Sequence, residues 1–218
     1  MKPLIIIGVG GFGRETAWIV HKINKNNPTW DFKGFVDLYD NNKTQTVEGY
    51  PILGDLKWLK KVAPDAYVVC AIGDPVKRYK LTRELEEIGF SFGTLIDPSV
   101  QMSDFVTVGE GSIICANCIL TTNINIGKHV LLNLGCTVGH DTILEDYFSA
   151  MPGVNISGDV KIGAGTYCGT GATIIDKLTV GVWSVIGAGA VVTKNIPDNV
   201  MAVGVPAKIM KENIPILR

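Results

Sequence analysis

The sequence predicts two folds in one chain: a small α/β domain over residues 1–95 and a parallel β-helix over residues 96–218. Two observations predict this arrangement. From Ile96 to Pro197 an apolar or small residue opens every group of six, and near the N-terminus a G-x-G-x-x-G motif follows a short apolar run. The first pattern spans about a hundred residues.

The groups of six, or hexads, run without interruption. Their first residues are Ile96, Met102, Val108, Ile114, Leu120, Ile126, Leu132, Val138, Leu144, Ala150, Ile156, Ile162, Cys168, Ile174, Val180, Ile186 and Val192. A second small or apolar residue stands four positions further on, as at Cys118 and Val154. An amphipathic helix needs an apolar period near 3.6 and an ordinary strand a period of two. A period of six instead indicates short strands wound into a β-helix.

A related turn recurs in every third hexad, as at Ile126-Gly127 and Ile162-Gly163, so one coil should hold three hexads and 18 residues. Each hexad then forms one face of a triangular prism, roughly 25 Å tall at the ordinary strand spacing. We expect the two apolar positions to fill the prism and all other side chains to point outward. The coil should end after Pro197, and the last ten residues are expected to be a tail.

The N-terminal half reads as alternating strands and helices. Strands are expected at 4–7, 32–36, 66–72 and 91–96, with helices at 14–23, 55–62 and 75–88. Asp74-Pro75 supplies an N-cap followed by proline at the first helical position, which is a typical helix start.

Three of these strands end in residues suited to a ligand site. Gly8 to Gly13 lies between a strand and a helix, the context in which G-x-G-x-x-G exposes backbone amides to a phosphate. Asp37 follows the second strand, 24 residues beyond Gly13, near the place of a ribose-binding acid, and Gly73 follows the third. Ligands of open α/β sheets bind at the carboxyl edge of the strands. A glycine turn without a ligand is the alternative interpretation.

Composition excludes several classes of protein. The 218 residues are 46% hydrophobic with a net charge of −1, and no Lys/Arg cluster suggests a nucleic-acid surface. No apolar run is long enough for a membrane span, and the N-terminus has no signal pattern. The five cysteines include one C-x-x-C, at Cys115 and Cys118, without a second pair. We interpret them as small core residues of a reduced, cytoplasmic protein.

Only three histidines are present. His21 is expected on the surface of the first helix, and His129 and His140 should point outward from the prism. Asp141 directly follows His140, so it can orient that imidazole, and an inert exposed histidine is the alternative. A three-histidine metal centre is disfavoured because the prism holds only two. Uncharged outward stretches such as Leu120–Asn123 and Leu131–Leu134 suggest self-association.

Several motifs together resemble a known family. They are the hexads, Gly139-His140-Asp141, the segments 155–163 and 187–192, the exit motif 203–208, and the N-terminal glycine loop with Ala71-Ile72-Gly73-Asp74. In combination they are similar to the bacterial sugar acetyltransferases of the NeuD/PglD type, which belong to the hexapeptide-repeat acyltransferases.

The resemblance implies a Rossmann-like N-terminal domain that binds a nucleotide sugar, a left-handed β-helix, and a homotrimer with active sites between prisms. It implies N-acetylation of the 4-amino group of a UDP- or dTDP-linked amino-deoxy sugar for glycan or polysaccharide assembly, with acetyl-CoA as co-substrate and no metal. His140 would be the general base, supported by Asp141. The residues implied in sugar-nucleotide binding are Gly10, Gly11, Phe12, Asp37, Leu38, Gly73 and Ser149, and those in acetyl-CoA binding are Gly158, Thr170 and Ala188.

The chain departs from the family pattern at two positions. Many members carry histidine where this chain has Phe12, and several carry a second histidine where it has Ser149. These differences leave the sugar open. The alternatives are O-acetylation of a sialic acid or related sugar, a small NAD-dependent oxidoreductase suggested by the glycine motif alone, and a non-catalytic scaffold.

Overall fold

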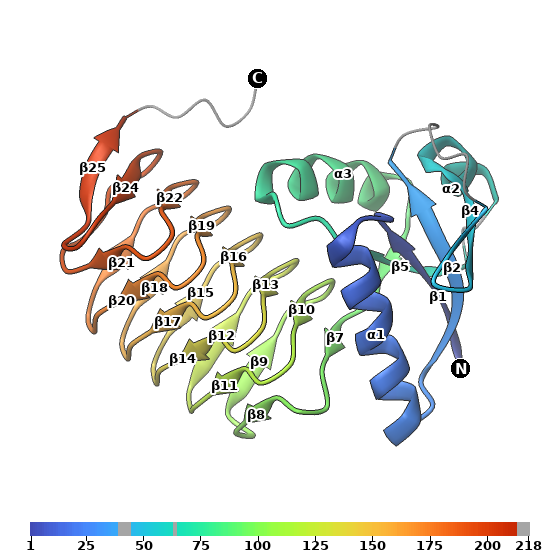
Figure 1. The fold of residues 1–218 in the computed structure, drawn as a ribbon, viewed down its shortest axis with the longest axis horizontal. Coiled ribbons are helices and arrows are strands. Elements are labelled where there is room, and N and C mark those ends of the chain that lie inside the picture. Colours follow the sequence, from blue (N-terminus) through green and yellow to red (C-terminus); the bar gives the residue numbers. More distant parts are fainter. Residues whose placement is uncertain (39–44, 63–64, 213–218) are drawn as a thin grey trace.

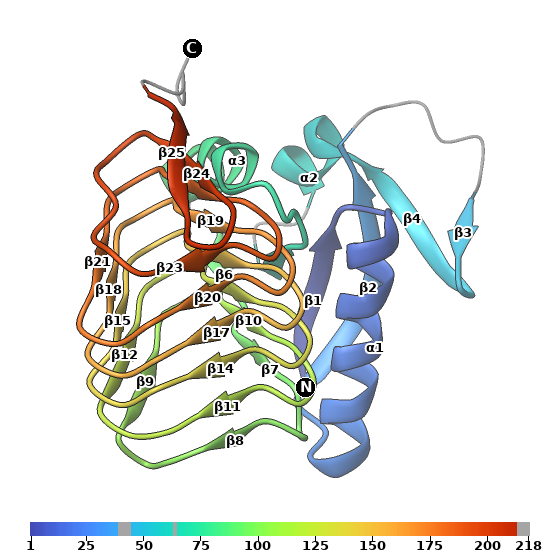
Figure 2. The ribbon, with the colours of Figure 1, turned by 60° about the vertical axis from the view of Figure 1, so that its left-hand side comes forward.

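The computed structural model describes residues 1–38, 45–62 and 65–212. It contains an α/β domain and a β-helix packed side by side (Figure 1). Figure 2 views the coils from another side and shows their triangular outline, with α3 over one edge of the coils.

The N-terminal domain is built on a six-stranded sheet in the order β3-β4-β2-β1-β5-β6. Its strands are β1 (Lys2–Ile7), β2 (Trp30–Asp37), β3 (Thr46–Val47), β4 (Tyr50–Asp55), β5 (Tyr67–Cys70) and β6 (Ser91–Phe92). All neighbouring strands run parallel except the β3–β4 hairpin. The sequence predicted β1, β2 and β5 but placed no strand at β3 or β4, which are short and only partly buried.

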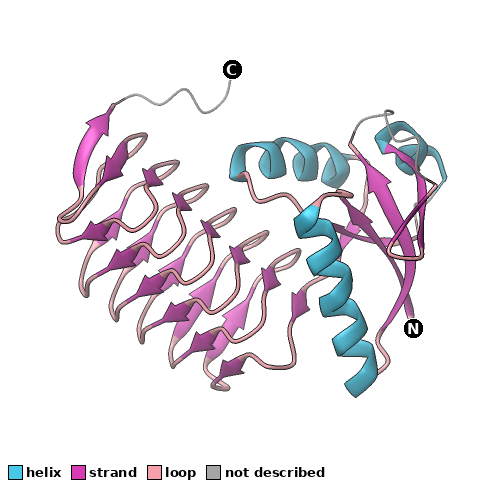
Figure 3. Ribbon diagram, in the orientation of Figure 1, coloured by secondary structure: helices cyan, strands magenta, loops and turns pink. Residues whose placement is uncertain are grey.

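Three helices cover the two faces of this sheet (Figure 3). On one face α1 (Gly11–Asn26) packs through Ala17, Ile19 and Val20. On the other, α2 (Leu56–Val62) and α3 (Pro75–Glu87) contribute Leu59, Leu81 and Leu85 to a second apolar cluster. Asp74 caps α3 as expected, because its carboxylate accepts hydrogen bonds from the amides of Val76 and Lys77.

Residues 95–212 form a left-handed parallel β-helix of three sheets. We name each sheet by its first strand. The β7 sheet holds β7 (Leu95–Ile96), β10 (Ile113–Ile114), β13 (Leu131–Leu132), β16 (Ser149–Ala150), β19 (Tyr167–Cys168), β22 (Val185–Ile186), β24 (Met201–Val203) and β25 (Lys208–Lys211). The β8 sheet holds β8 (Gln101–Met102), β11 (Ile119–Leu120), β14 (Thr137–Val138), β17 (Asn155–Ile156), β20 (Thr173–Ile174) and β23 (Val191–Val192). The β9 sheet holds β9 (Val106–Val108), β12 (Ile124–Ile126), β15 (Ile143–Leu144), β18 (Lys161–Ile162) and β21 (Thr179–Val180).

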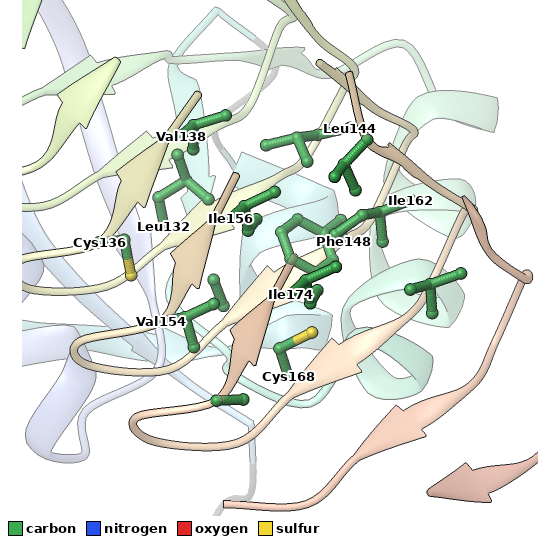
Figure 4. Close-up of a cluster of buried hydrophobic side chains, with 14 of the residues drawn as sticks. Leu132, Cys136, Val138, Leu144, Phe148, Val154, Ile156, Ile162, Cys168 and Ile174 are labelled. Carbon is green, nitrogen blue, oxygen red and sulfur yellow. The ribbon is translucent and has the colours of Figure 1, made fainter. Parts of the chain in front are cut away.

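The coil repeat of 18 residues is confirmed by the strand register. Leu132 pairs with Ala150, and Val138 pairs with Ile156, so residues 18 apart stack in adjacent coils. The first residues of the hexads fill the interior (Figure 4), with exceptions at the end of the stack such as Met102, which is 38% exposed. Phe148 lies four positions into its hexad and is also completely buried there.

Three corners join the sheets, and each turns by placing one residue of most coils at positive φ; in the first coil, residues 98–99 and 104–105 turn without one. The His140 corner, between the β8 and β9 sheets, contains residues 122–123, 140–141, 158–159 and 176–177. The Thr170 corner, between the β7 and β8 sheets, contains 116–117, 134–135, 152–153, 170–171 and 188–189. The joint corner, between the β9 and β7 sheets, contains 110–111, 128–129, 146–147, 164–165 and 182–183. Backbone hydrogen bonds link successive coils at all three, as from Asp159 N to His140 O at 2.7 Å.

The N-terminal domain covers the outer face of the β7 sheet. Leu95, Ile113 and Leu131 point outward from the prism yet are buried against α1 and β1. The expectation that Leu131–Leu134 forms an association surface is therefore wrong for its first three residues, which are buried within this chain; only Leu134 is exposed.

The passage between the two parts also differs from the expected strand at 91–96. β6 pairs with β5 of the α/β sheet, whereas β7 pairs with β10 of the prism. Gly93 lies between them where a Cβ atom would come within 3.0 Å of Leu4 and 3.2 Å of Trp30. The exit also differs from the expected tail, because β25 turns back antiparallel to β24. The part of the expected tail at 213–218 lies outside the described residues.

Candidate active site

His140 and Asp141 lie at the corner where β14 ends. His140 Nδ1 is 2.8 Å from Asp141 Oδ2, and both side chains are more than half exposed. Asp141 has a φ of +59°, a conformation that short polar residues tolerate better than most. The coil turn therefore directs an imidazole and a carboxylate together into solvent.

A third residue contacts this pair. Asn123, one coil earlier at the same corner, donates from Nδ2 to Asp141 Oδ1 at 2.5 Å. The hydrogen bonds from Asn123 and then from His140 hold the pKa of Asp141 below its usual value. A carboxylate can only accept, so His140 Nδ1 is the donor of this contact, and in a neutral imidazole with that hydrogen the lone pair is on Nε2. Sequence reasoning missed Asn123, although its spacing of 18 from Asp141 gives both residues the same place in adjacent coils.

Gly158 lies against the His140 ring, one coil later. A Cβ atom at position 158 would come within 2.5 Å of His140 Nε2 and 2.6 Å of Cε1. Only glycine leaves room for the imidazole in this orientation. The structure thus brings Gly158 together with His140 and Asp141.

The glycine loop closes the turn between β1 and α1. Gly8 has a φ of +111°, and a Cβ at Gly13 would lie only 2.0 Å from Gly8 O. Gly10 precedes α1 without a capping side chain, and nothing lies within 4 Å of the place where its Cβ would be. Gly11 begins the helix and is exposed, so the first amides face an open space suited to an anion. Phe12 is half-buried and packs against the apolar cluster beside α1.

Asp37, Leu38 and Gly73 lie at the same carboxyl edge, after β2 and β5. Leu38 lines a hollow of about 310 Å³ with Leu56, Ile72 and Leu81 as apolar lining and Lys77, Lys80 and Glu84 from α3. Gly73 is half-buried, with the methyl group of Met151 3.8 Å from the place of its missing Cβ. The nucleotide-binding positions expected in this domain therefore lie at one edge of the sheet. Ser149, the remaining expected position, belongs to the prism.

Ser149 is completely buried at the contact between domain and prism. Its hydroxyl donates to Gly73 O at 3.0 Å and accepts from Arg78 Nη2 at 2.7 Å. Its side chain therefore offers no surface to a ligand, and it supports the loop that carries Gly73 instead of lining the site itself.

Arg78 is the centre of this contact and was also missed. It is 2% exposed and donates to His129 O at 2.9 Å, Ile72 O at 2.6 Å and Tyr147 O at 2.8 Å. Burial lowers its pKa to about 10, so it stays charged at neutral pH. A single side chain of α3 thus links the end of β5 to two coils of the prism.

His129 points outward from the prism as expected, but it is only 1% exposed because the N-terminal domain covers it. Its ring stacks on Tyr147 and contacts the edge of Phe92, and Nε2 lies 3.3 Å from Glu86. His21 is exposed, as expected. His140 is therefore the prism histidine that a substrate can reach.

Thr170 and Ala188 lie one above the other at the Thr170 corner, where Gly189 N donates to Thr170 O at 2.8 Å. Both are exposed. The β8 sheet separates them from Gly158 and His140. The three positions implied in acetyl-CoA binding are thus divided between two edges of one sheet.

The glycine loop lies beside the Thr170 corner. Val9 and Phe12 pack in the same apolar cluster as Met151, which directly precedes that corner. His140 lies at the opposite edge of the β8 sheet. Within one chain, the glycine loop and the His140–Asp141 pair are therefore apart.

Within the described ranges there is no group of three or more His, Cys, Asp or Glu placed to hold a metal ion, and all five cysteines are free and buried. Among the same residues, no helix has the length and apolar character needed to cross a membrane.

Comparisons with known proteins cover the whole architecture. Residues 3–85 match the PglD N-terminal domain family. The chain is 32% identical over 213 residues to GDP-perosamine N-acetyltransferase from Escherichia coli O157:H7, covering 95% of this chain and 96% of that protein.

Solved structures agree with this. PerB from Caulobacter crescentus, in complex with CoA and GDP-perosamine, has a TM-score of 0.86 and 31% identity, covering 97% of this chain and 98% of that one. WeeI from Acinetobacter baumannii has a TM-score of 0.85 and 34% identity, covering 96% and 100%. The sequence-based assignment is confirmed: the chain belongs to the NeuD/PglD-type bacterial sugar acetyltransferases, a family of acetyl-CoA-dependent N-acetyltransferases.

Proposed function

We propose that this enzyme transfers the acetyl group of acetyl-CoA to the 4-amino group of a nucleotide-linked amino-deoxy sugar, with His140 as general base. The observation that carries the proposal is the 2.8 Å contact between His140 and Asp141 on an exposed corner of the prism. The relatives named for GDP-perosamine make a GDP-linked 4-amino sugar the first candidate, beside the UDP- and dTDP-linked sugars.

The proposed chemistry uses few groups. The neutral sugar amine attacks the thioester carbonyl, and His140 Nε2 accepts a proton from the nitrogen as the C–N bond forms. Asp141 stabilises the resulting imidazolium through Nδ1. The intermediate collapses with cleavage of the C–S bond, and the His140 imidazolium returns the proton to the leaving sulfur, giving the amide, CoA thiol and neutral His140. A positioned base contributes about 10²- to 10⁴-fold, and the backbone amide of Gly158, next to the ring, would stabilise the oxyanion.

Binding of the nucleotide is proposed at the carboxyl edge of the α/β sheet. The diphosphate would face the amides of Gly10 and Gly11, where the α1 dipole favours negative charge. Phe12 would pack beside it, and Asp37, Leu38 and Gly73 would surround the nucleoside. Ser149 would contribute by holding the Gly73 loop.

We propose that the enzyme is a homotrimer, and the separation of these groups supports a site completed by a neighbouring chain. His140 and the glycine loop of its own chain lie at opposite edges of the β8 sheet, so in the proposed assembly the His140 corner of a neighbouring prism would approach the loop. Ile119 and Ile175 are 42% and 37% exposed on this side of the prism, and Ile143 is 44% exposed on the β9 sheet. Closed rings with heterologous contacts bring unlike surfaces of identical chains together. Acetyl-CoA would then lie between prisms, near Gly158, Thr170 and Ala188.

Acetyl-CoA-dependent thiol release with a panel of GDP-, UDP- and dTDP-linked 4-amino sugars, sialic acid and buffer alone tests the chemistry. We expect release with a nucleotide 4-amino sugar and its loss in His140→Ala at an unchanged melting temperature. Release with sialic acid only would establish O-acetylation instead. Full turnover by His140→Ala would remove the general base from the proposal.

Coexpression of two inactive chains tests the shared site. Gly11→Asp introduces a carboxylate at the first turn of α1, where it suits the helix but repels a diphosphate. When Gly11→Asp and His140→Ala chains assemble at random in equal amounts, about a quarter of the interfaces should combine an intact glycine loop with an intact His140. Those interfaces should be active. No recovery in verified mixed oligomers would place both halves of the site in one chain.

A further inference from the structure

Asn123 and Asp141 occupy equivalent positions in adjacent coils of the His140 corner. They are 18 residues apart and both adopt left-handed backbone conformations, with φ of +53° and +59°. Parallel stacking at about 4.8 Å brings the two short side chains within hydrogen-bond reach. The coil repeat therefore fixes their contact independently of the N-terminal domain.

The two oxygens of Asp141 have different partners. Oδ1 accepts from Asn123 Nδ2 at 2.5 Å, and Oδ2 lies 2.8 Å from His140 Nδ1. The carboxylate is more than half exposed, so water and rotation would otherwise compete for both oxygens. Asn123 occupies one oxygen and leaves the other directed at the imidazole.

We propose that Asn123 is a positioning residue, which holds the Asp141 carboxylate so that His140 keeps its hydrogen on Nδ1 and presents Nε2 to the substrate amine. This inference rests on the proposed role of His140 as general base. Asparagine suits the position for two reasons. Its amide donates without neutralising the carboxylate, and its side chain tolerates the left-handed backbone better than a β-branched or bulky one.

Two substitutions separate the amide from the backbone. Asn123→Gly deletes the donor and accepts positive φ without strain. Asn123→Asp keeps the shape but replaces the donor with a second carboxylate, which repels Asp141. Asn125→Ala is the matched control: Asn125 accepts a similar bond between coils, from Thr107 Oγ1 at 3.2 Å, on the neighbouring β9 sheet.

We expect Asn123→Gly to lower kcat about tenfold, the loss that one charge-assisted hydrogen bond corresponds to. KM for acetyl-CoA and for the sugar should stay within about twofold, since neither substrate is bound through Asn123 in this scheme. Asn123→Asp should lower kcat at least as much, and Asn125→Ala should match the wild type.

Nitrogen-15 NMR of the imidazoles gives a second measurement, and three histidines make the spectrum tractable. In the wild type at neutral pH, His140 should be the Nδ1–H tautomer; in Asn123→Gly it should become a mixture. Wild-type kcat and an unchanged tautomer in Asn123→Gly would overturn the inference. A lower kcat accompanied by a lower melting temperature, with the tautomer unchanged, would also overturn it, because that pattern belongs to a structural role.

His140→Ala separates this inference from the proposed function. If that variant retains turnover, His140 is not the base and the function itself fails. If it is inactive while Asn123→Gly is normal, only the positioning role fails.

Discussion

Arg78→Met should weaken the attachment of the N-terminal domain to the prism. Arg78 donates four hydrogen bonds of 2.6 to 2.9 Å, to three backbone carbonyls and the Ser149 hydroxyl. Methionine fills similar space but supplies no donor, so four buried acceptors lose their partner.

The expected magnitude follows from two opposing terms. Hydrogen bonds from a charged donor are worth about 1.5–3 kcal/mol each, so four give about 6–12 kcal/mol. Removing the guanidinium also relieves its desolvation penalty, which is several kcal/mol for a buried ion. The net loss in free energy of unfolding should be about 3–5 kcal/mol. For a chain of this length that corresponds to a fall in Tm of at least about 6 °C.

Differential scanning calorimetry measures both the size and the form of the effect. Because Arg78 connects the two parts, its loss should also separate unfolding into two transitions, with the α/β domain melting first. Arg83→Met on the same helix is the control: Arg83 is about half exposed, and its ion pair with Glu86 should contribute less than about 1 kcal/mol. A single transition within about 2 °C of the wild type for Arg78→Met would refute the assignment of the joint to this residue.

Three other predictions concern a buried histidine, the site and the core. Burial lowers the pKa of His129, outweighing the Glu86 contact that raises it, so the folded state resists a proton that the unfolded chain accepts below about pH 6.5. The free energy of unfolding, measured by urea titration, should decrease below that pH by up to about 1.4 kcal/mol per pH unit. The decrease should be smaller in His129→Gln and should persist in His21→Gln. Gly158→Ala should displace the His140 ring and lower kcat at unchanged Tm, and a wild-type kcat would contradict the packing described. Ile156→Asp would place an unpaired charge between coils and should abolish soluble expression; a soluble variant of normal Tm would refute the register.

The β-helix could be predicted almost completely because its contacts repeat at a fixed spacing. Once the coil length is known to be 18, the neighbour of every core residue follows, as for Val138 and Ile156. The same 18-residue spacing places Gly158 beside His140 and Asn123 beside Asp141. Of these two neighbours, only Gly158 was predicted as a site residue from the sequence. Corner geometry contributes too, since most corners use one residue of the coil at positive φ.

The joint between the two parts could not be predicted in this way. Arg78 contacts His129 and Ser149 across 51 and 71 residues of sequence, and no repeat connects a helix to a coil. An arginine on a helix ordinarily indicates a solvated face, and outward prism residues ordinarily meet water. In this structure the helix that carries Arg78 packs on outward residues of the prism. Arg78, His129 and Ser149 are therefore buried, and Leu131 is not available as an association surface.

The prism and the α/β domain differ in how their residues are held in position. Each coil of the prism is hydrogen-bonded to the next, as His140 O is to Asp159 N, so His140 and Asp141 sit on a scaffold whose positions are set by the repeat. The α/β domain is held on the prism by an apolar contact through Leu95, Ile113 and Leu131 and by the hydrogen bonds of the buried Arg78. A change of sugar or base can therefore alter the α/β domain without moving the His140–Asp141 pair. If the site is shared between chains, as proposed, the fit between donor and base depends on how Arg78 docks the domain on its own prism. Substitutions at the joint should then raise KM for the sugar nucleotide, whereas those at Asn123 and Gly158 should lower kcat.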